Sequence, residues 1–551
     1  MITDRLASLV GRALEAAAAA GDIPAPLSDQ LLFERPRRRE HGDWATNIAL
    51  SLAQGGGNPR AIAESIVKHL PESDLIDKVE IAGPGFLNFK LADSWLHDVV
   101  REAADAKTTF GRGAPTGTKF NVEYVSANPT GPINVVSGRH AAIGDAIASL
   151  LEAAGHTVTR EFYVNDAGRQ ARLFGESIAA RYLELHGSVA DIPEGGYQGD
   201  YVIDIARAVD AEIGDSLVDK DAETRNEEFR RRGLALMLDE MRASLERFGT
   251  TYDLWFSEQT LHAAGDVERA IAALEDKGLV EERDGAKWLL TTRFGDDKDR
   301  VIVRASGEPT YLAADAAYLM NKFGRGFDRL IYLWGADHHG AINRLKAAAQ
   351  GLGFDADAVE IPIVQVVTLS SGSESLKGSK RAGVIVKLDD LVDEVGADAA
   401  RYTFLTRSIE APLDFDVAAV KEQAPENPVY YVQYAHARIC SILAKAASEG
   451  HQPDPDTAPL DLLKEPAEDQ LMRKLASFEE VTGEAASQRS PQKMTRYVEE
   501  LASDFSAFYR DCKVVTDDDD LTAARIALCV ATKRVIADGL AILGVSAPER
   551  M

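Results

Sequence analysis

Two short segments of the chain carry residue types that bind phosphate. The first, residues 126–139, reads Ser-Ala-Asn-Pro-Thr-Gly-Pro-Ile-Asn-Val-Val-Ser-Gly-Arg. It follows an apolar stretch, residues 119–125, that predicts a strand, and it leads into an amphipathic helical pattern. A strand, a tight turn and a helix N-terminus make a site for an anion, because free N–H groups and the helix dipole both favour negative charge there.

The second segment, residues 376–383, reads Leu-Lys-Gly-Ser-Lys-Arg-Ala-Gly. Its two lysines, Lys377 and Lys380, predict a loop that closes cations onto phosphate groups. Taken alone, a pair of lysines is equally consistent with a solvated loop tip. Together, the two segments favour the two halves of an ATP site.

Strands and helices alternate around these segments. Short apolar runs predict strands at residues 122–125, 158–163, 330–334 and 361–367. Alternation of this kind predicts a parallel sheet with crossover connections, and therefore a Rossmann-like domain over residues 113–387. Mostly charged helical patterns over about residues 171–295 predict a helical insertion in that domain.

The two flanking regions have different patterns. Residues 1–112 predict an α+β domain, with a hairpin over residues 79–89 at an Ala-Gly-Pro-Gly turn. Residues 388–551 are helical in pattern and predict an all-α bundle. We therefore expect a multidomain α/β protein, as its 551 residues are too many for one core.

Composition excludes several classes of protein. The formal charge of −27 opposes indiscriminate binding to DNA or to a membrane surface. No apolar run is long enough to span a bilayer. Cys440, Cys512 and Cys529 are far apart and lack the spacing of zinc ligands. We expect a reduced, cytoplasmic protein with no structural metal.

Six motifs carry a resemblance to a known family. They occupy residues 121–132, 161–168, 334–340, 377–381, 427–438 and 544–551. Together they resemble bacterial arginyl-tRNA synthetases, which are class I aminoacyl-tRNA synthetases. The resemblance implies that residues 1–112 bind tRNA, that residues 113–387 are catalytic and that the C-terminal bundle binds the anticodon.

The chain departs from the family at its first signature. Class I enzymes have His-x-Gly-His after the Gly-Pro turn, and these positions read Asn134-Val-Val-Ser137 here. Asn134 can donate a hydrogen bond, and Ser137 can donate one and cap the helix, but neither becomes cationic. The resemblance implies that Asn134, Ser137, Lys377 and Lys380 are catalytic. We expect His140 to lie on the helix surface without a role, with replacement of an absent histidine as the alternative.

The resemblance also implies a set of ATP contacts, with Mg²⁺ as part of the ATP substrate. The turn that contains Gly335 and Asp337 follows an apolar strand, where open α/β folds bind ligands. For Asp337, His338 and His339 we favour a nucleotide contact over a metal site, because adjacent histidines rarely reach one ion. The implied ATP-binding residues are Gly131, Pro132, Asn134, Ser137, Gly335, Asp337, His338, Ser379 and Lys380.

Arginine needs acceptors for its guanidinium and partners for its charged ends, because a buried cation without partners is costly. The resemblance implies that Glu123, Ser126 and Asn128 hold the amino-acid end, while Tyr311 and Asp315 bind the guanidinium. Tyr311 and Asp315 share one face if their segment is helical. From spacing alone, Glu123 is an exposed strand residue and Tyr311 is a core residue.

The C-terminal helices carry aromatic and basic residues at near-helical spacing. Such a stripe is more often part of a core, but exposed Tyr and Arg side chains also suit single-stranded bases. The resemblance implies that tRNA contacts Tyr431, Tyr434, Arg438, Tyr509 and Met551.

The sequence therefore predicts a monomeric arginine–tRNA ligase whose partners are tRNA(Arg), L-arginine and ATP. The resemblance implies that tRNA is bound before efficient adenylate formation. Two alternatives remain at this point. One is a paralogue that binds tRNA or arginine without charging, and the other is an enzyme that transfers arginine to a different acceptor.

Overall fold

The computed structural model describes residues 2–551 apart from 25–30, 37, 106, 108, 372–373, 376–385, 425 and 453. It contains two compact units. The first unit comprises residues 1–110, 443–479 and 507–532, and the second comprises residues 111–442, 480–506 and 533–551. The break at residue 110 lies in a segment rich in Gly and Pro, residues 109–117.

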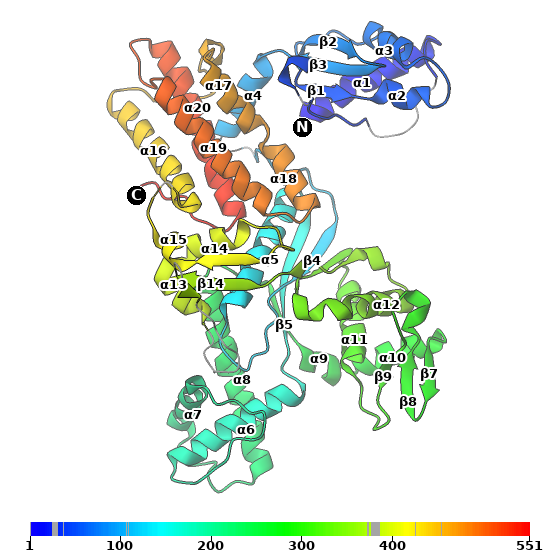
Figure 1. The fold of residues 1–551 in the computed structure, drawn as a ribbon, viewed down its shortest axis with the longest axis vertical. Coiled ribbons are helices and arrows are strands. Elements are labelled where there is room, and N and C mark those ends of the chain that lie inside the picture. Colours follow the sequence, from blue (N-terminus) through cyan, green and yellow to red (C-terminus); the bar gives the residue numbers. More distant parts are fainter. Residues whose placement is uncertain are drawn as a thin grey trace. The chain divides into compact units, whose positions relative to one another are not determined.

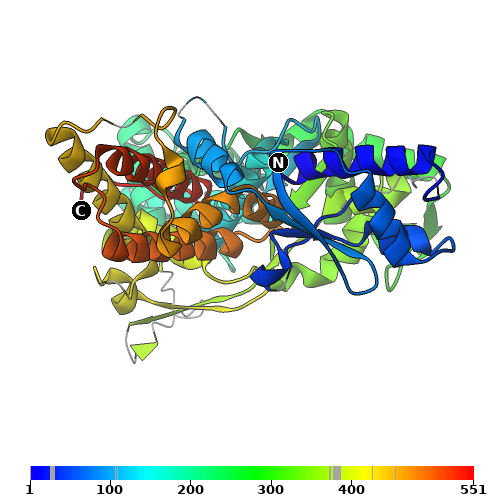
Figure 2. The same ribbon diagram turned by 90° about the horizontal axis from the view of Figure 1, so that it is seen from above.

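In the first unit, a three-stranded antiparallel sheet has the order β1-β3-β2. The predicted hairpin is confirmed, and it packs against α2 and α3 (Figure 2). At its turn, Gly85 has φ +148° and a Cβ there would lie 2.9 Å from the Pro59 carbonyl oxygen, so only glycine fits. The elements are α1 (Ile2–Ala19), β1 (Trp44–Thr46), α2 (Ile48–Ala53), α3 (Pro59–Lys68), β2 (Ile76–Ala82), β3 (Phe86–Leu91), α4 (Ser94–Ala104) and α17 (Pro466–Ala476).

The second unit is built on a five-stranded parallel sheet in the order β12-β10-β4-β5-β6. If these five strands are numbered by their order in the chain and read from β6 to β12, the sheet has the order 3-2-1-4-5. This is the doubly wound arrangement, and it confirms the predicted Rossmann-like fold. The strands are β4 (Lys119–Glu123), β5 (Thr157–Val164), β6 (Leu254–Ser257), β10 (Arg329–Tyr332) and β12 (Val359–Glu360).

Helices and a small antiparallel sheet connect these strands. Between β5 and β6, three helices pack together as one group (Figure 1): α6 (Gly168–Leu185), α7 (Asp200–Ile213) and α8 (Ala222–Arg247). The range 171–295 also contains β6, so the chain returns to the sheet inside the predicted insertion. The other connecting elements are α5 (Val135–Ala153), α9 (Glu258–Ala263), α10 (Asp266–Asp276), β7 (Val280–Arg283), β8 (Ala286–Leu289), β9 (Arg300–Val303), α11 (Tyr311–Gly324) and α12 (Ile342–Leu352).

Two small sheets extend the second unit, with two parallel pairings and one antiparallel pairing. β11 (Trp334–Gly335) pairs in parallel with β13 (Ile363–Val364), and β14 (Val367–Ser371) pairs antiparallel with β15 (Glu374–Ser375) and in parallel with β16 (Leu413–Asp416). β16 lies within residues 388–551, so the purely helical part begins after Asp416. Its Leu413-Asp-Phe-Asp416 sequence alternates apolar and polar side chains, as a half-buried strand does.

The remaining helices follow in chain order. Among the described residues, no helix is long and apolar enough to cross a membrane. α16, α18, α19 and α20 each have residues in both units. The bounds are α13 (Leu388–Val395), α14 (Ala397–Leu405), α15 (Val417–Lys421), α16 (Pro428–Ser448), α18 (Phe478–Ser487), α19 (Gln492–Asp511) and α20 (Asp519–Ile542).

Candidate functional site

The carboxyl ends of β4 and β10 lie side by side at the point where the strand order reverses. Glu123, the last residue of β4, is paired in register with Tyr332, the last residue of β10. From β10 the chain continues to Gly335 and a short 3₁₀ helix, Ala336–Ala341. The fold therefore brings residues 126–139, the first of the two segments predicted to bind phosphate, to the turn that contains Asp337. Doubly wound sheets bind ligands at this edge.

The backbone that follows β4 is strained. Val125 and Ser126 have φ values of +67° and +42°, a region that non-glycine residues occupy at a cost of about 1–3 kcal/mol. The Ser126 hydroxyl donates to Glu123 Oε1 at 3.2 Å and accepts from the Tyr163 N–H at 3.1 Å. These two bonds hold Ser126 between β4 and β5.

Asn134, rather than Ser137, caps helix α5. The Asn134 Oδ1 accepts from the Ser137 N–H at 2.9 Å, and the Asn134 carbonyl accepts from the Gly138 N–H. The Val135 N–H donates to the Val386 carbonyl at 3.2 Å. Of the first four N–H groups of α5, only that of Val136 has no acceptor among the described residues. The helix start therefore offers fewer backbone donors than the sequence predicts.

The second phosphate segment, with Lys377, Ser379 and Lys380, lies outside the described residues. The backbone that follows it is described and lies beside the first segment. The Leu388 N–H donates to the Ile133 carbonyl at 2.9 Å, next to the bond between Val135 and Val386. The backbone at Val386 and Leu388, just after the second segment, is thus bonded to the start of α5.

Gly335 allows close approach of backbone and side chains at this edge. A Cβ at Gly335 would lie 2.8 Å from Asp337 Oδ1 and 3.8 Å from His140 Cε1. The Asp337 and His338 side chains are 81% and 60% exposed. His140 is only 8% exposed, so the expectation of a helix-surface histidine is wrong. The crossing of α5 with the Gly335 turn covers it.

Two carboxylates with raised pKa values lie beyond the end of β4. Burial raises the pKa of Asp315 to about 7, with Glu258 and Glu123 raising it and Arg344 lowering it. Burial also raises the pKa of Glu258, and a hydrogen bond from Tyr163 opposes this. A bound cation would stabilise the ionised form of both carboxylates, which burial disfavours. Sequence reasoning missed Glu258 because the four-residue strand before it, β6, has no distinct pattern.

Helix α11 brings Tyr311 and Asp315 onto one face, as predicted for a helical segment. Tyr311 is the first residue of α11 and its side chain is 66% exposed. The alternative that Tyr311 belongs to the core is therefore wrong. Tyr311 is open to solvent one helical turn before Asp315.

Glu123 already has a partner inside the protein. It is 7% exposed, and its Oε2 lies 2.6 Å from the Nζ of Lys322, a residue with no exposed surface. The alternative that Glu123 is an exposed strand residue is therefore wrong. Lys322 also lies over the rings of Tyr318 and Tyr332, at 4.3 and 3.9 Å from their centroids. Burial lowers the pKa of Lys322, and Glu123 opposes that shift.

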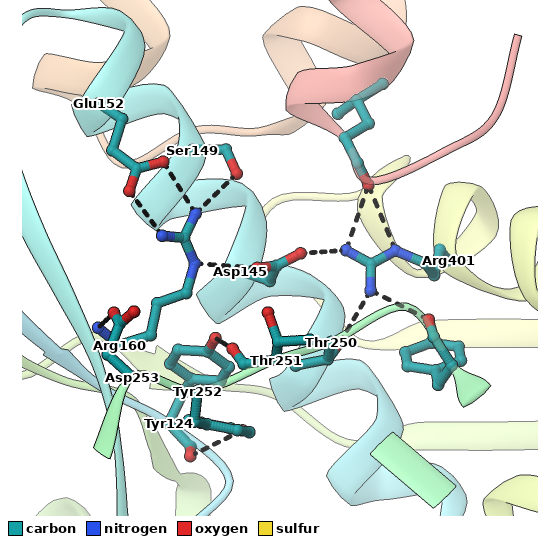
Figure 3. A network of polar contacts seen from close by, with 12 residues as sticks. Tyr124, Asp145, Ser149, Glu152, Arg160, Thr250, Thr251, Tyr252, Asp253 and Arg401 are labelled. Carbon is teal, nitrogen blue, oxygen red and sulfur yellow. Dashed lines mark hydrogen bonds and ion pairs between the residues drawn. The ribbon is translucent and has the colours of Figure 1, made fainter. Parts of the chain in front are cut away.

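Buried ion pairs hold α5 in position. Asp145 lies between two guanidinium groups, with Arg160 at 3.1 Å and Arg401 at 2.5 Å (Figure 3). Arg401 also donates to the Thr250 hydroxyl at 2.8 Å and to the carbonyls of Phe248 and Leu543. Gly544 has φ +67°, and a Cβ there would overlap the Arg401 guanidinium. The network therefore joins α5, β5 and α14 to the chain after α20.

Arg139 anchors the same helix from its other side. This residue has no exposed surface, and burial lowers its pKa. Its guanidinium donates to four backbone carbonyls, those of Gln365, Val366, Ser408 and Ala411.

Most of the predicted tRNA-contacting side chains lie in the second unit. On α16, Tyr434 is 40% exposed and the Arg438 guanidinium lies 4.6 Å from its ring centroid. Tyr431 is half-buried and donates to Ser506 at 3.4 Å. The chain end is tied to α16, because His436 Nδ1 lies 2.9 Å from the Pro548 carbonyl. Met551 is 55% exposed, and Tyr509, in the first unit, is 43% exposed.

Comparison with known families gives three matches along the chain. Residues 4–91 match the arginyl tRNA synthetase N terminal domain. Residues 100–408 match the catalytic domain of tRNA synthetases class I (R). Residues 432–551 match the DALR anticodon binding domain.

Curated relatives match along nearly the whole chain. An arginine–tRNA ligase of Moorella thermoacetica is 47% identical, covering 99% of this chain and 98% of its own. An arginine–tRNA ligase of Frankia alni is 46% identical, covering 100% of this chain and 99% of its own. The solved structure of Thermus thermophilus arginyl-tRNA synthetase superposes with a TM-score of 0.77 at 23% identity, over 100% of both chains.

Among the described residues, no cluster of three or more His, Cys, Asp or Glu side chains could hold a metal.

Proposed function

Because the chain belongs to the family of class I arginyl-tRNA synthetases, we propose that it activates L-arginine with ATP and transfers the arginyl group to the 3′ end of tRNA(Arg). The observation that carries this function is the match of 99% of the chain to arginine–tRNA ligases at 47% identity. Neither alternative, binding without charging or transfer to another acceptor, has support from these relatives. The chain is an aminoacyl-tRNA ligase.

The reaction needs no nucleophile from the protein. A carboxylate oxygen of arginine attacks the α-phosphorus of Mg·ATP, and the bond to the bridging oxygen of pyrophosphate breaks. A terminal ribose hydroxyl of tRNA then attacks the carbonyl carbon of the adenylate, AMP leaves, and the hydroxyl proton is released. The protein therefore acts by positioning the reactants and stabilising charge.

The proposed ATP site occupies the edge where β4 and β10 end. Gly131, Pro132, Asn134 and Ser137 would face the phosphates, and Gly335, Asp337 and His338 would face the nucleoside. Lys377, Ser379 and Lys380 would close over the triphosphate. The hydrogen bonds of Val135 and Leu388 support this part of the proposal, since they bring the backbone after the second segment beside the first.

The proposed arginine site lies beyond the end of β4. Asp315 and Glu258 would bind the guanidinium, with Tyr311 covering it, because both carboxylates have raised pKa values that a cation would lower. Ser126, Asn128 and Glu123 would hold the amino-acid end. Since Lys322 already balances the Glu123 charge, Glu123 would contribute mainly by holding Ser126.

The proposed tRNA contacts remain those implied by the family. The exposed Tyr434 ring with Arg438 suits a stacked base, and Tyr431 and Met551 of the same unit would contact tRNA, as would Tyr509 of the first unit. The proposed domains are residues 1–112 for tRNA, 113–387 for catalysis and 388–551 for the anticodon. We propose that the protein acts as a monomer in the cytoplasm.

Arginine-dependent exchange of pyrophosphate into ATP tests the proposed function. Purified protein is expected to catalyse this exchange with arginine and tRNA(Arg), and to charge tRNA(Arg) with labelled arginine. Lysine in place of arginine is the control, because its ammonium cannot pair bidentately with Asp315 and Glu258. Absence of exchange with and without tRNA would exclude the ligase function. Exchange without charging would favour another acceptor.

The affinity for arginine is expected to depend on pH. The pKa of Asp315 is about 7 in the free protein, and a bound guanidinium would lower it. Above pH 7 the carboxylate is already ionised, whereas below pH 7 binding must release a proton. The dissociation constant of arginine should therefore rise about tenfold from pH 8 to pH 6. Isothermal titration calorimetry in two buffers measures both the constant and the proton release.

The Asp315→Asn variant is the control for this pH dependence. It cannot titrate, so its dissociation constant for arginine should change less than about twofold over the same range. An equal pH dependence in this variant would assign the titration to a group other than Asp315.

A further inference from the structure

His140 is a buried imidazole at the centre of the proposed ATP site. It lies on α5, three residues after Ser137 and six after the Asn134 cap. Side chains on a helix lean toward its N-terminus, so the imidazole is directed toward the start of α5. Its Cε1 lies 3.8 Å from the position that a Cβ of Gly335 would occupy. His140 therefore lies between the phosphate segment and the Gly335 turn.

The structure shows no hydrogen bond between the ring and another described residue, and only 8% of the residue is exposed. The ring nitrogens are not among the buried side-chain atoms that lack a partner, so the small exposed surface includes ring nitrogen that a ligand could reach. The neighbouring charged groups are Arg139 on the same helix and Asp337 and His338 on the Gly335 turn. None of these three accepts a hydrogen bond from the ring.

The start of α5 also lacks donors for phosphate. Asn134 Oδ1 is used in capping Ser137, and only the Val136 N–H of the first four remains without an acceptor in the described chain. The two signature histidines of the family are absent at Asn134 and Ser137. An additional donor at this place would offset that loss.

We propose that His140 donates a hydrogen bond to ATP where the adenosine joins the phosphate chain, and so takes over part of the role of the absent signature histidines. This inference rests on the proposed function. Burial, with Arg139 nearby, lowers the pKa of His140 to about 4. The free imidazole is thus neutral at pH 7 and donates from one nitrogen, as an amide side chain could.

An isosteric pair of substitutions tests this role. His140→Gln and His140→Met fill similar space, but only glutamine can donate a hydrogen bond. The Met variant is expected to lose about 10- to 30-fold in kcat/KM for ATP in arginine-dependent exchange, as for a lost bond to a charged group. The Gln variant should stay within about threefold of the unmodified protein. Both should bind arginine with unchanged affinity by calorimetry.

The matched control is His156→Ala, because His156 lies just past the far end of α5 and bonds to Thr116 at 2.7 Å. Its kcat/KM for ATP should not change. Equal losses in the Gln and Met variants, or no loss in either, would overturn the role of His140 while leaving the ligase function intact. An unmodified protein without exchange would overturn the ligase function and this role together. Melting temperatures of all variants separate a folding defect from a loss of ATP contact.

Discussion

Replacing Arg401 with alanine is expected to lower the free energy of local unfolding of helix α5 by about 3–5 kcal/mol. Arg401 is 1% exposed and pairs with Asp145, which is itself 9% exposed (Figure 3). Its removal leaves the carbonyls of Phe248 and Leu543 and the Thr250 hydroxyl without their donor. Breaking a buried pair by removing one partner is costly because the remaining charge stays buried.

Hydrogen exchange of peptides from residues 135–153 measures this effect. A local measurement is needed because a chain with two compact units does not unfold in a single step. Arg207→Ala is the control, since Arg207 and Asp204 form a pair whose side chains are 65% and 73% exposed. That change should cost less than about 0.5 kcal/mol.

A double-mutant cycle with Asp145→Asn separates the ion pair from the other contacts of Arg401. If the pair dominates, the double variant should lose less than the sum of the two single variants. Strictly additive losses would assign the stabilisation to the backbone carbonyls. A change in exchange no larger than that of Arg207→Ala would contradict the role of the network in holding α5.

The Asp315→Asn and Glu258→Gln variants are each expected to raise KM for arginine by about 100- to 1,000-fold. Each change removes one carboxylate from the proposed guanidinium site, and the loss of a buried charged partner weakens binding strongly. With a pKa of about 7, Asp315 is about half protonated in the free protein at pH 7. The neutral amide of Asn resembles that protonated carboxyl, so we expect the variant to fold. Steady-state pyrophosphate exchange at varied arginine and fixed ATP measures the change.

Glu308→Gln is the matched control for these two variants. Glu308 precedes α11, its side chain is 71% exposed, and it pairs with Arg304 at the surface. Its KM for arginine should stay within about twofold of the unmodified protein. An equal rise in KM for ATP and for arginine would show that Asp315 or Glu258 supports the whole site rather than the guanidinium.

Much of the fold follows from local patterns in the sequence. The strand β4 over residues 119–123, the Gly-Pro turn and the helix after it are each specified by side-chain periodicity and turn residues close in sequence. The strand β6 escaped prediction because Leu254-Trp-Phe-Ser257 is too short to show a period. β16 alternates apolar and polar residues over only four positions, too few to predict a strand alone, and its pairing with β14 stabilises it.

The candidate site was predicted less completely, because its members come from distant parts of the chain. The motifs near residues 123, 134, 315 and 335 were recognised individually, but their partners were not. Nothing close in sequence to Glu123 indicates Lys322 as its ion-pair partner. Likewise, the burial of His140 depends on Gly335, which reaches α5 only through the strand order of the sheet.

The sequence by itself thus determined the family and the Rossmann-like parallel-sheet domain, because motifs and short-range periodicity are local properties. Only the tertiary structure decided the charge environment of each site residue. Burial and the approach of distant charges set whether Asp315 is protonated, whether Glu123 is free and whether His140 reaches solvent. Those are long-range effects, and they arise when parallel strands far apart in the chain end at one edge.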